Sequence, residues 1–119
     1  MKRILVVDDE EMNLKMASFI LSQKGYEVQP VTSGIECLHK LESTPVDLII
    51  LDVEMPVMNG IKTLECIREK EEYITIPVMF LTADVNEETV LAAGRLGVAD
   101  YLKKPYMPQQ FLERVEKLL

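Results

Sequence analysis

The chain has 119 residues, a formal net charge of −7, and 48% hydrophobic and 28% charged residues. This length suits one domain with a full core, so we predict a single domain over residues 1–119. No apolar run approaches the ~20 residues that a membrane span needs, and no signal peptide opens the chain, so we expect a cytoplasmic protein. The acidic charge disfavours direct binding to nucleic acid or to an anionic membrane.

Strand-like and helix-like segments alternate along the whole chain. Runs rich in Val, Ile and Leu predict strands near residues 3–8, 26–31, 47–51, 77–81 and 98–102. Apolar residues spaced three or four apart predict helices near residues 12–24, 34–43, 60–71, 86–96 and 108–118. Five strand–helix units joined by right-handed crossovers imply an α/β fold with a doubly wound parallel sheet.

Punctuating residues support these boundaries in chain order. Gly25 and Gly97 follow helical segments as expected C-terminal stops. Pro30 lies inside the second strand-like run, and we expect an edge strand there because proline cannot donate a backbone hydrogen bond to a neighbouring strand. Ser33 is expected to cap the second helix, and Pro108 suits the first turn of the last one.

Polar side chains stand where four of the apolar runs end. Asp8 and Asp9 end the first run, Asp52 follows the most apolar one, Thr82 follows the fourth, and Lys104 follows the fifth. In an open parallel sheet such ends converge on one edge, where ligands bind. Three carboxylates, a hydroxyl and an ammonium together predict a site for a divalent cation and a phosphoryl group.

The cysteines and the only histidine do not point to further chemistry. Cys37 and Cys66 form no closely spaced pair, so we predict reduced thiols and neither a disulfide nor a metal site. His39 stands mid-helix beside a lysine, far in sequence from every motif. We interpret it as a solvated surface residue and not as a phosphodonor or ligand.

Taken in order, the polar motifs resemble those of bacterial two-component response regulator receiver domains, including the chemotaxis regulators. Each element alone is common by chance, but all four in sequence, each at a strand end, are specific. The resemblance implies a flavodoxin-like (βα)5 fold with a five-stranded parallel sheet in the order 2-1-3-4-5. It covers the whole chain and is carried by Asp8-Asp9, Asp52 with Met55–Gly60, Thr82-Ala83 and Asp100–Pro105, in which the family's Lys-Pro bond is cis.

The resemblance implies a role for each polar residue at the sheet edge. Asp52 is the expected phosphoacceptor: a carboxylate oxygen attacks phosphorus in line and displaces the nitrogen of a phosphohistidine donor. Lys104 is expected to bind the phosphoryl oxygens and to pair with Asp52 before transfer. The expected metal is Mg2+, with Mn2+ possible; Asp9 and Asp52 bind it directly, the backbone carbonyl of Glu54 adds a ligand, and Asp8 acts partly through water.

Other residues are expected to report phosphorylation. By resemblance, the Thr82 hydroxyl and the Ala83 backbone N–H turn toward the phosphoryl oxygens. Tyr101 is the expected switch aromatic; it moves into space left by Thr82 and alters the face made by the fourth helix, fifth strand and fifth helix. Gly94 lies inside the fourth helix and weakens it, so we hypothesise that this helix is less protected against hydrogen exchange than the first and fifth.

The implied partners are a histidine kinase or a histidine phosphotransfer protein as donor, and an unknown output domain or protein. In the DNA-binding branch of the family a basic residue and a glutamate pair across a dimer, but this chain has Val90 and Gln110 there. Asp100 and Arg114 do match that branch. We therefore expect a monomer or a weak, phosphorylation-dependent dimer. The sequence stops at Leu119, so it is either a stand-alone receiver or part of a longer protein.

Two other functions compete with the phosphorylated receiver. The expected receiver is a switch and not a turnover enzyme, since it catalyses only its own phosphorylation and slow dephosphorylation. A Mg-dependent aspartyl-nucleophile phosphohydrolase usually needs a second Asp two residues after the nucleophile, where this chain has Glu54. A degenerate receiver would act without phosphorylation, although the site residues are intact. A nucleotide-binding site is disfavoured because no Gly-rich loop follows the first strand.

Glu54 and Asp84 are expected to repel anionic donors when metal is absent.

Overall fold

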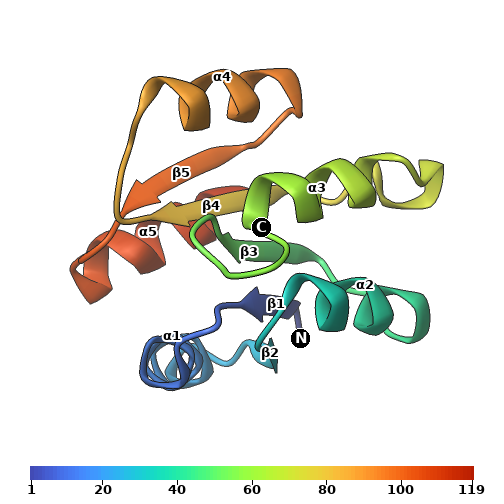
Figure 1. The fold of residues 1–119 in the computed structure, drawn as a ribbon. Helices are drawn as coiled ribbons and strands as arrows, with labels where there is room; N and C mark the ends of the chain where they lie inside the picture. The colour runs from blue at the N-terminus through green and yellow to red at the C-terminus, as the bar shows by residue number, and fades with distance from the viewer.

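The protein, described over residues 1–119 by a computed structural model, places a parallel sheet between two layers of helices (Figure 1). The strands are β1 (Arg3–Val7), β2 (Glu27–Val31), β3 (Leu48–Asp52), β4 (Val78–Thr82) and β5 (Asp100–Lys103). The helices are α1 (Glu11–Gln23), α2 (Gly34–Ser43), α3 (Gly60–Arg68), the 3-10 turn η1 (Glu71–Tyr73), α4 (Glu87–Arg95) and α5 (Pro108–Leu118).

The strand order is β2-β1-β3-β4-β5, and every neighbouring pair is parallel, which confirms the predicted fold class. The central strands β3 and β4 are buried at every position, because helices cover both faces of the sheet. Strand β2 pairs only with β1, so Pro30 lies on an edge strand as predicted.

Alternate residues of β1, β3 and β4 supply two separate cores. In β1, Ile4 and Val6 face a core shared with α1 and α5, whereas Leu5 and Val7 face a core shared with α2, α3 and α4. Cys37 is buried in the second core, and both cysteines are free thiols, as predicted. None of the helices has the length and apolar character that crossing a membrane requires.

The residues expected to punctuate the chain do so. The Ser33 hydroxyl accepts a hydrogen bond from the backbone N–H of Glu36 at 3.1 Å, which caps α2. Gly25 and Gly97 adopt φ values of +85° and +68° after α1 and α4, in the left-handed region that glycine enters most easily. The Lys104–Pro105 peptide bond is cis, as the family resemblance implied.

The prediction of a helix over residues 60–71 is wrong at its C-terminal end, because α3 ends at Arg68. The Arg68 guanidinium donates hydrogen bonds to the carbonyl oxygens of Leu96 at 3.1 Å, Tyr73 at 3.1 Å and Ile76 at 3.3 Å. These bonds hold the segment after α3 and the end of α4 against the arginine side chain. Residues 69–72 are mostly acidic, and negative charge at a helix C-terminus opposes the helix dipole, so the helix is not extended.

Candidate functional site

The register of the sheet brings the predicted polar residues to one edge. Asp52 and Thr82 are the last residues of β3 and β4, one position further into the sheet than the sequence patterns indicated. Asp8 follows β1 directly, and Lys104 follows β5 directly. The backbone N–H of Lys104 donates to the carbonyl oxygen of Thr82 at 2.8 Å, which fixes these two residues side by side.

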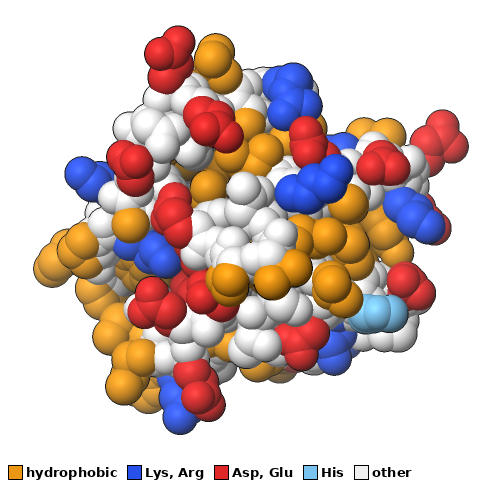
Figure 2. Space-filling model, viewed as in Figure 1, with side chains coloured by type: hydrophobic (Ala, Val, Ile, Leu, Met, Phe, Trp, Pro, Cys, Tyr) orange, Lys and Arg blue, Asp and Glu red, His pale blue; other side chains and the backbone are white.

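Three carboxylates meet at this edge. One oxygen each from Asp8, Asp9 and Asp52 lies within 4.8 Å of the others. Asp8 and Asp52 are only 2% and 1% exposed, whereas Asp9 is open to solvent. The Asp8 side chain also accepts a hydrogen bond from the Glu10 backbone N–H at 2.9 Å, which holds the start of α1 against the site. Acidic side chains gather over this part of the surface (Figure 2).

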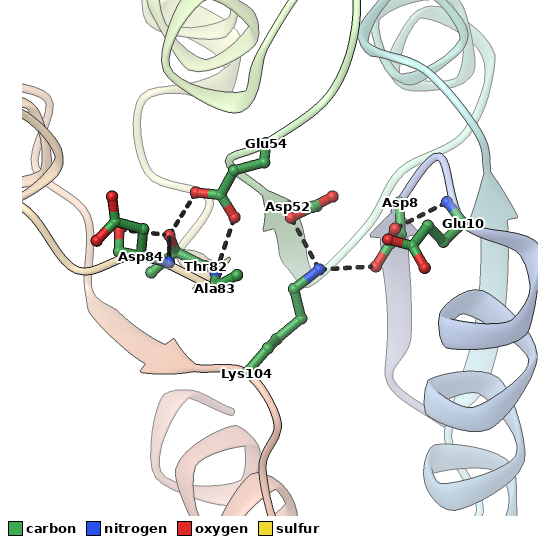
Figure 3. A network of polar contacts seen from close by, with 8 residues as sticks. All are labelled: Asp8, Glu10, Asp52, Glu54, Thr82, Ala83, Asp84 and Lys104. Carbon is green, nitrogen blue, oxygen red and sulfur yellow. Dashed lines mark hydrogen bonds and ion pairs between the residues drawn. The ribbon is translucent and has the colours of Figure 1, made fainter.

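Lys104 provides the positive charge that the cluster needs. Its Nζ lies 3.0 Å from Asp52 Oδ1 and 3.6 Å from Asp8 Oδ2, so one ammonium bridges two buried carboxylates (Figure 3). The pair between Lys104 and Asp52 is the one that the family resemblance implied. The contact with Asp8 was not expected, since Asp8 was assigned to the metal.

Burial and like charge dominate the electrostatics. Burial, followed by the neighbouring Asp8 charge, raises the pKa of Asp52 to about 7 against the opposing hydrogen bond and charge of Lys104. Burial lowers the pKa of Lys104, but the hydrogen bond and charge of Asp52 outweigh it, so the net shift is upward. An additional cation at this edge would favour the ionised form of Asp52.

The residues fit a divalent cation by their donor chemistry. Mg2+ prefers oxygen ligands and keeps several waters, so a few carboxylates suffice. Three carboxylates, from Asp8, Asp9 and Asp52, face the single ammonium of Lys104, which leaves two negative charges uncompensated when all are ionised (3 − 1). Asp9 gives the cluster an open side through which a hydrated ion can enter. The role of the Glu54 carbonyl stays a prediction.

Thr82 and Ala83 are engaged by a side chain that the sequence did not indicate. The Thr82 hydroxyl lies 2.5 Å from Glu54 Oε2, and the Ala83 N–H donates to Glu54 Oε1 at 2.8 Å. Figure 3 shows the Glu54 carboxylate directed toward these two groups, while Asp52 is directed toward Lys104. From the sequence we expected the Glu54 carbonyl to bind metal and its charge to repel anionic donors, but we expected no contact of its side chain with Thr82 or Ala83.

Close backbone packing supports Asp52 from behind. A Cβ at Gly60 would collide with the Asp52 carbonyl oxygen and would lie 2.8 Å from the Val53 Cα. The Gly60 N–H donates to the Val53 carbonyl oxygen at 2.9 Å, and the Asn59 side chain caps α3 by accepting from the Lys62 N–H at 2.8 Å. The N-terminus of α3 therefore rests directly on the strand end that carries Asp52.

The expected switch and dimer residues lie outside this cluster. Tyr101 is exposed on β5, and its movement stays a prediction. Val90 is exposed on α4. Arg114 pairs with Asp100 of the same chain at 2.9 Å, so these two charges already have partners within one molecule.

Comparisons with known proteins agree with the geometry of the site. Residues 4–116 match the response regulator receiver domain family. The chain is 36% identical over 118 residues to the alkaline phosphatase synthesis transcriptional regulatory protein PhoP of Bacillus subtilis, covering 99% of this chain and 48% of PhoP. It is 35% identical over 120 residues to the response regulator SaeR of Staphylococcus aureus, covering 100% of this chain and 51% of SaeR. The chain thus spans about half the length of these curated relatives.

A solved structure shows the same similarity over a full chain. The chemotaxis protein CheY4 of Vibrio cholerae superposes with a TM-score of 0.95 at 33% identity, covering 100% of this chain and 99% of CheY4. The strand order, the acidic cluster and the lysine at the end of β5 are therefore found in a chain whose whole length is similar to a receiver protein. The chain belongs to the response regulator receiver domain family of two-component signalling.

Proposed function

We propose that the protein is a phosphorylation-controlled signalling receiver in which Asp52 accepts a phosphoryl group from a phosphohistidine. The donor is a histidine kinase or a histidine phosphotransfer protein. The observation that carries this proposal is a buried aspartate at a strand end, paired with Lys104 at 3.0 Å and clustered with Asp8 and Asp9. A buried nucleophile with both charge partners beside it is suited to phosphoryl transfer.

In the proposed step, Asp52 uses the oxygen that Lys104 does not hold. Lys104 binds Oδ1, so Oδ2 attacks phosphorus in line with the leaving nitrogen. An O–P bond forms as the N–P bond breaks, and the bonding electron pair stays on the imidazole nitrogen. The proton on the other ring nitrogen keeps the leaving imidazole neutral. Lys104, with a flexible stem, follows the transferred oxygens.

Asp9 and Asp52, with Asp8 through water and the Glu54 carbonyl, are the residues that would hold Mg2+ or Mn2+. The bound ion supplies positive charge that neutralises the transferring phosphoryl oxygens. Lys104 supplies a second positive charge beside Asp52. Burial of Asp8 and Asp52 keeps this charge interaction out of bulk water, where it would be weaker.

An exposed apolar stripe on α1 supports docking of a protein donor beside Asp52. Met12, Met16 and Phe19 are 72%, 55% and 66% exposed, and their spacing of four and three residues places them on one side of the helix. Met16 and Lys104 line the same cavity of about 390 Å3. Hydrophobic side chains gather along this side of the molecule in Figure 2. An apolar donor surface placed here would bring its phosphohistidine to the site.

The proposed output follows from Thr82 and Tyr101. After transfer, the Thr82 hydroxyl and the Ala83 N–H bind the phosphoryl oxygens. Tyr101 moves inward, and the face of α4, β5 and α5 then changes its affinity for a partner. The protein catalyses only its own phosphorylation and a slow loss of the phosphoryl group.

Acetyl phosphate tests this proposal directly. The wild-type protein, incubated with acetyl phosphate and Mg2+, is expected to gain one phosphoryl group in its intact mass. Asp52→Asn is expected to gain none, because its amide cannot act as the nucleophile. Chelation of the metal should suppress the adduct in the wild type.

Two results would contradict the proposal. An adduct of equal yield on Asp52→Asn would place the acceptor elsewhere, and no adduct on folded wild type would indicate a receiver that acts without phosphorylation. Sustained turnover of a small phosphoester would favour the phosphohydrolase.

A further inference from the structure

Glu54 binds the two groups that the proposed function reserves for the phosphoryl group. Its Oε1 accepts from the Ala83 N–H at 2.8 Å, and its Oε2 lies 2.5 Å from the Thr82 hydroxyl oxygen. The two oxygens of one carboxylate therefore take both donors at once. Glu54 comes from the loop after β3, whereas the donors come from the end of β4, so the contact joins neighbouring strands (Figure 3).

The carboxylate and a phosphoryl group make the same demand on these donors. Both present negatively charged oxygens, and hydrogen bonds to charged acceptors are the stronger kind. The Thr82 hydroxyl has one proton to donate. Its alternative acceptor, the Asp84 carbonyl oxygen, lies at 2.9 Å and carries no net charge, so the Glu54 oxygen at 2.5 Å is the preferred one. Neither donor can serve Glu54 and a phosphoryl oxygen fully at the same time.

We propose that Glu54 is an internal stand-in for the phosphoryl group, which occupies the Thr82 and Ala83 donors before phosphorylation and is displaced by it. This inference rests on the proposed function of Asp52. Glu54 is a positioning residue, because it acts through Thr82 and Ala83 and not on the reacting atoms. Its effect is to slow the formation of the acyl phosphate, since transfer must break two charge-assisted hydrogen bonds.

Displacement of the Glu54 carboxylate also changes which groups move when Asp52 is phosphorylated. The Thr82 hydroxyl is already turned toward Glu54 in the loop after β3, and its oxygen accepts a hydrogen bond at 3.1 Å from the backbone N–H of Asp84, two residues further along its own segment. Phosphorylation then exchanges the acceptor of Thr82 instead of reorienting a free hydroxyl. The group that must move is Glu54, whose negative charge is repelled by the new phosphoryl group on Asp52.

Hydrogen exchange at Ala83 tests the contact without any phosphorylation. Ala83 is exposed, and its N–H donates to Glu54, so its exchange rate reports this bond. In metal-free buffer, Glu54→Ala is expected to speed exchange of the Ala83 amide about tenfold, the change expected for loss of a hydrogen bond to a charged acceptor. Glu54→Asp keeps the charge but is one methylene shorter, and it should show most of the same increase.

The rate of adduct formation tests the consequence. With acetyl phosphate and Mg2+, Glu54→Ala is expected to form the Asp52 adduct about tenfold faster than wild type. Glu10→Ala is the matched control. It removes one acidic side chain from the same edge, and the Glu10 side chain neither caps α1 nor contacts Thr82 or Ala83. Any increase in Glu10→Ala measures the effect of charge alone.

Each outcome decides between the alternatives. Unchanged Ala83 exchange in Glu54→Ala, or equal rate increases in Glu54→Ala and Glu10→Ala, would overturn the stand-in role while leaving Asp52 as the acceptor. Lack of an adduct in wild type, Glu54→Ala and Glu10→Ala would reject the proposed function and, with it, the proposed effect of Glu54 on the rate. Ala83 exchange would then separately show whether the contact exists. Faster exchange together with a rate increase specific to Glu54 supports the inference.

Discussion

Asp52 is held by its backbone as much as by its side-chain partners. Its carbonyl oxygen lies against Gly60, where there is no room for a Cβ, and its side chain is bound by Lys104 at 3.0 Å. A shift of the strand end would therefore move the carboxylate away from both Lys104 and Asp8. This dependence makes the glycine part of the site, although it has no side chain that could take part in the chemistry.

Gly60→Ala is expected to lower the free energy of unfolding by about 2 kcal/mol, because an added methyl group forces packed backbone apart. The substitution should also slow phosphorylation of Asp52 by acetyl phosphate. Urea unfolding and intact-mass kinetics measure the two effects. The matched control is Gly94→Ala, since a Cβ at Gly94 would meet no atom within 4 Å. Equal stability of Gly60→Ala and wild type would show that the loop yields without cost.

The identity of the site residues and the Asp52–Lys104 pair were predictable, but two further contacts at the site were not. The type and order of Asp8, Asp52 and Lys104 carry the chemistry, and the parallel sheet brings strand ends together by its geometry. The contact of Lys104 with Asp8, and that of Glu54 with Thr82, depend on side-chain reach across the edge. No residue pattern along one segment records which of several nearby partners a flexible side chain selects.

Helix α4 is the least firmly packed of the helices around the sheet. Its buried residues are the small side chains of Thr89, Ala92 and Ala93, whereas α5 buries Phe111 and α1 buries several large aliphatic side chains. Apolar area buried per helix sets most of the stability of a helix in a protein. The structure thus adds a packing reason to the weakness that Gly94 alone indicated.

Backbone amides of α4 are expected to exchange faster than those of α1 and α5 in the unphosphorylated protein. Gly94→Ala should slow exchange in α4 and raise the free energy of unfolding by up to about 1 kcal/mol, since the new methyl group meets open space. Hydrogen exchange followed by NMR or mass spectrometry measures both. Equal protection of α4 and α1 in the wild type would contradict this view of α4.

The sequence predicted which segments form helices and which form strands, but it missed details that long-range contacts decide. The end of α3 is fixed by Arg68, whose acceptors lie in later segments. Val57 adopts φ of +68° in the loop after β3, a conformation that a β-branched residue rarely enters. The Met58 N–H donates to the Pro56 carbonyl oxygen at 2.7 Å, and this tight turn holds Val57 in a conformation that its own preference disfavours.

For the whole molecule, the strand order places all the acidic strand ends on one edge, and the fold tolerates their repulsion. A bound divalent ion should therefore stabilise the native protein, because it binds the folded cluster and not the dispersed carboxylates of the unfolded chain. The spacing of apolar residues predicted the strands and helices, whereas the strand order that brings these ends together was implied by the family resemblance.

Mg2+ at ten times its dissociation constant should raise the free energy of unfolding by about 1.4 kcal/mol, which corresponds to roughly 6 °C in Tm for a chain of this size. Thermal melts with and without Mg2+ measure the shift. Asp9→Asn should lose most of it, whereas Glu11→Gln should keep it, because Glu11 is an exposed residue paired with Lys15. A wild-type melt unaffected by millimolar Mg2+ would argue against an acidic pocket.

Arg68 has a mechanical consequence that extends beyond the end of α3. Its guanidinium donates hydrogen bonds to the carbonyl oxygens of Leu96 and Gly97, just after the C-terminus of α4. The N-terminus of α4 follows the segment that carries Thr82. A helix whose C-terminal end is held in place rotates about that end when its N-terminal end is displaced. Small displacements beside Thr82 would then be converted into an angular swing of α4, with the arginine as the fixed point.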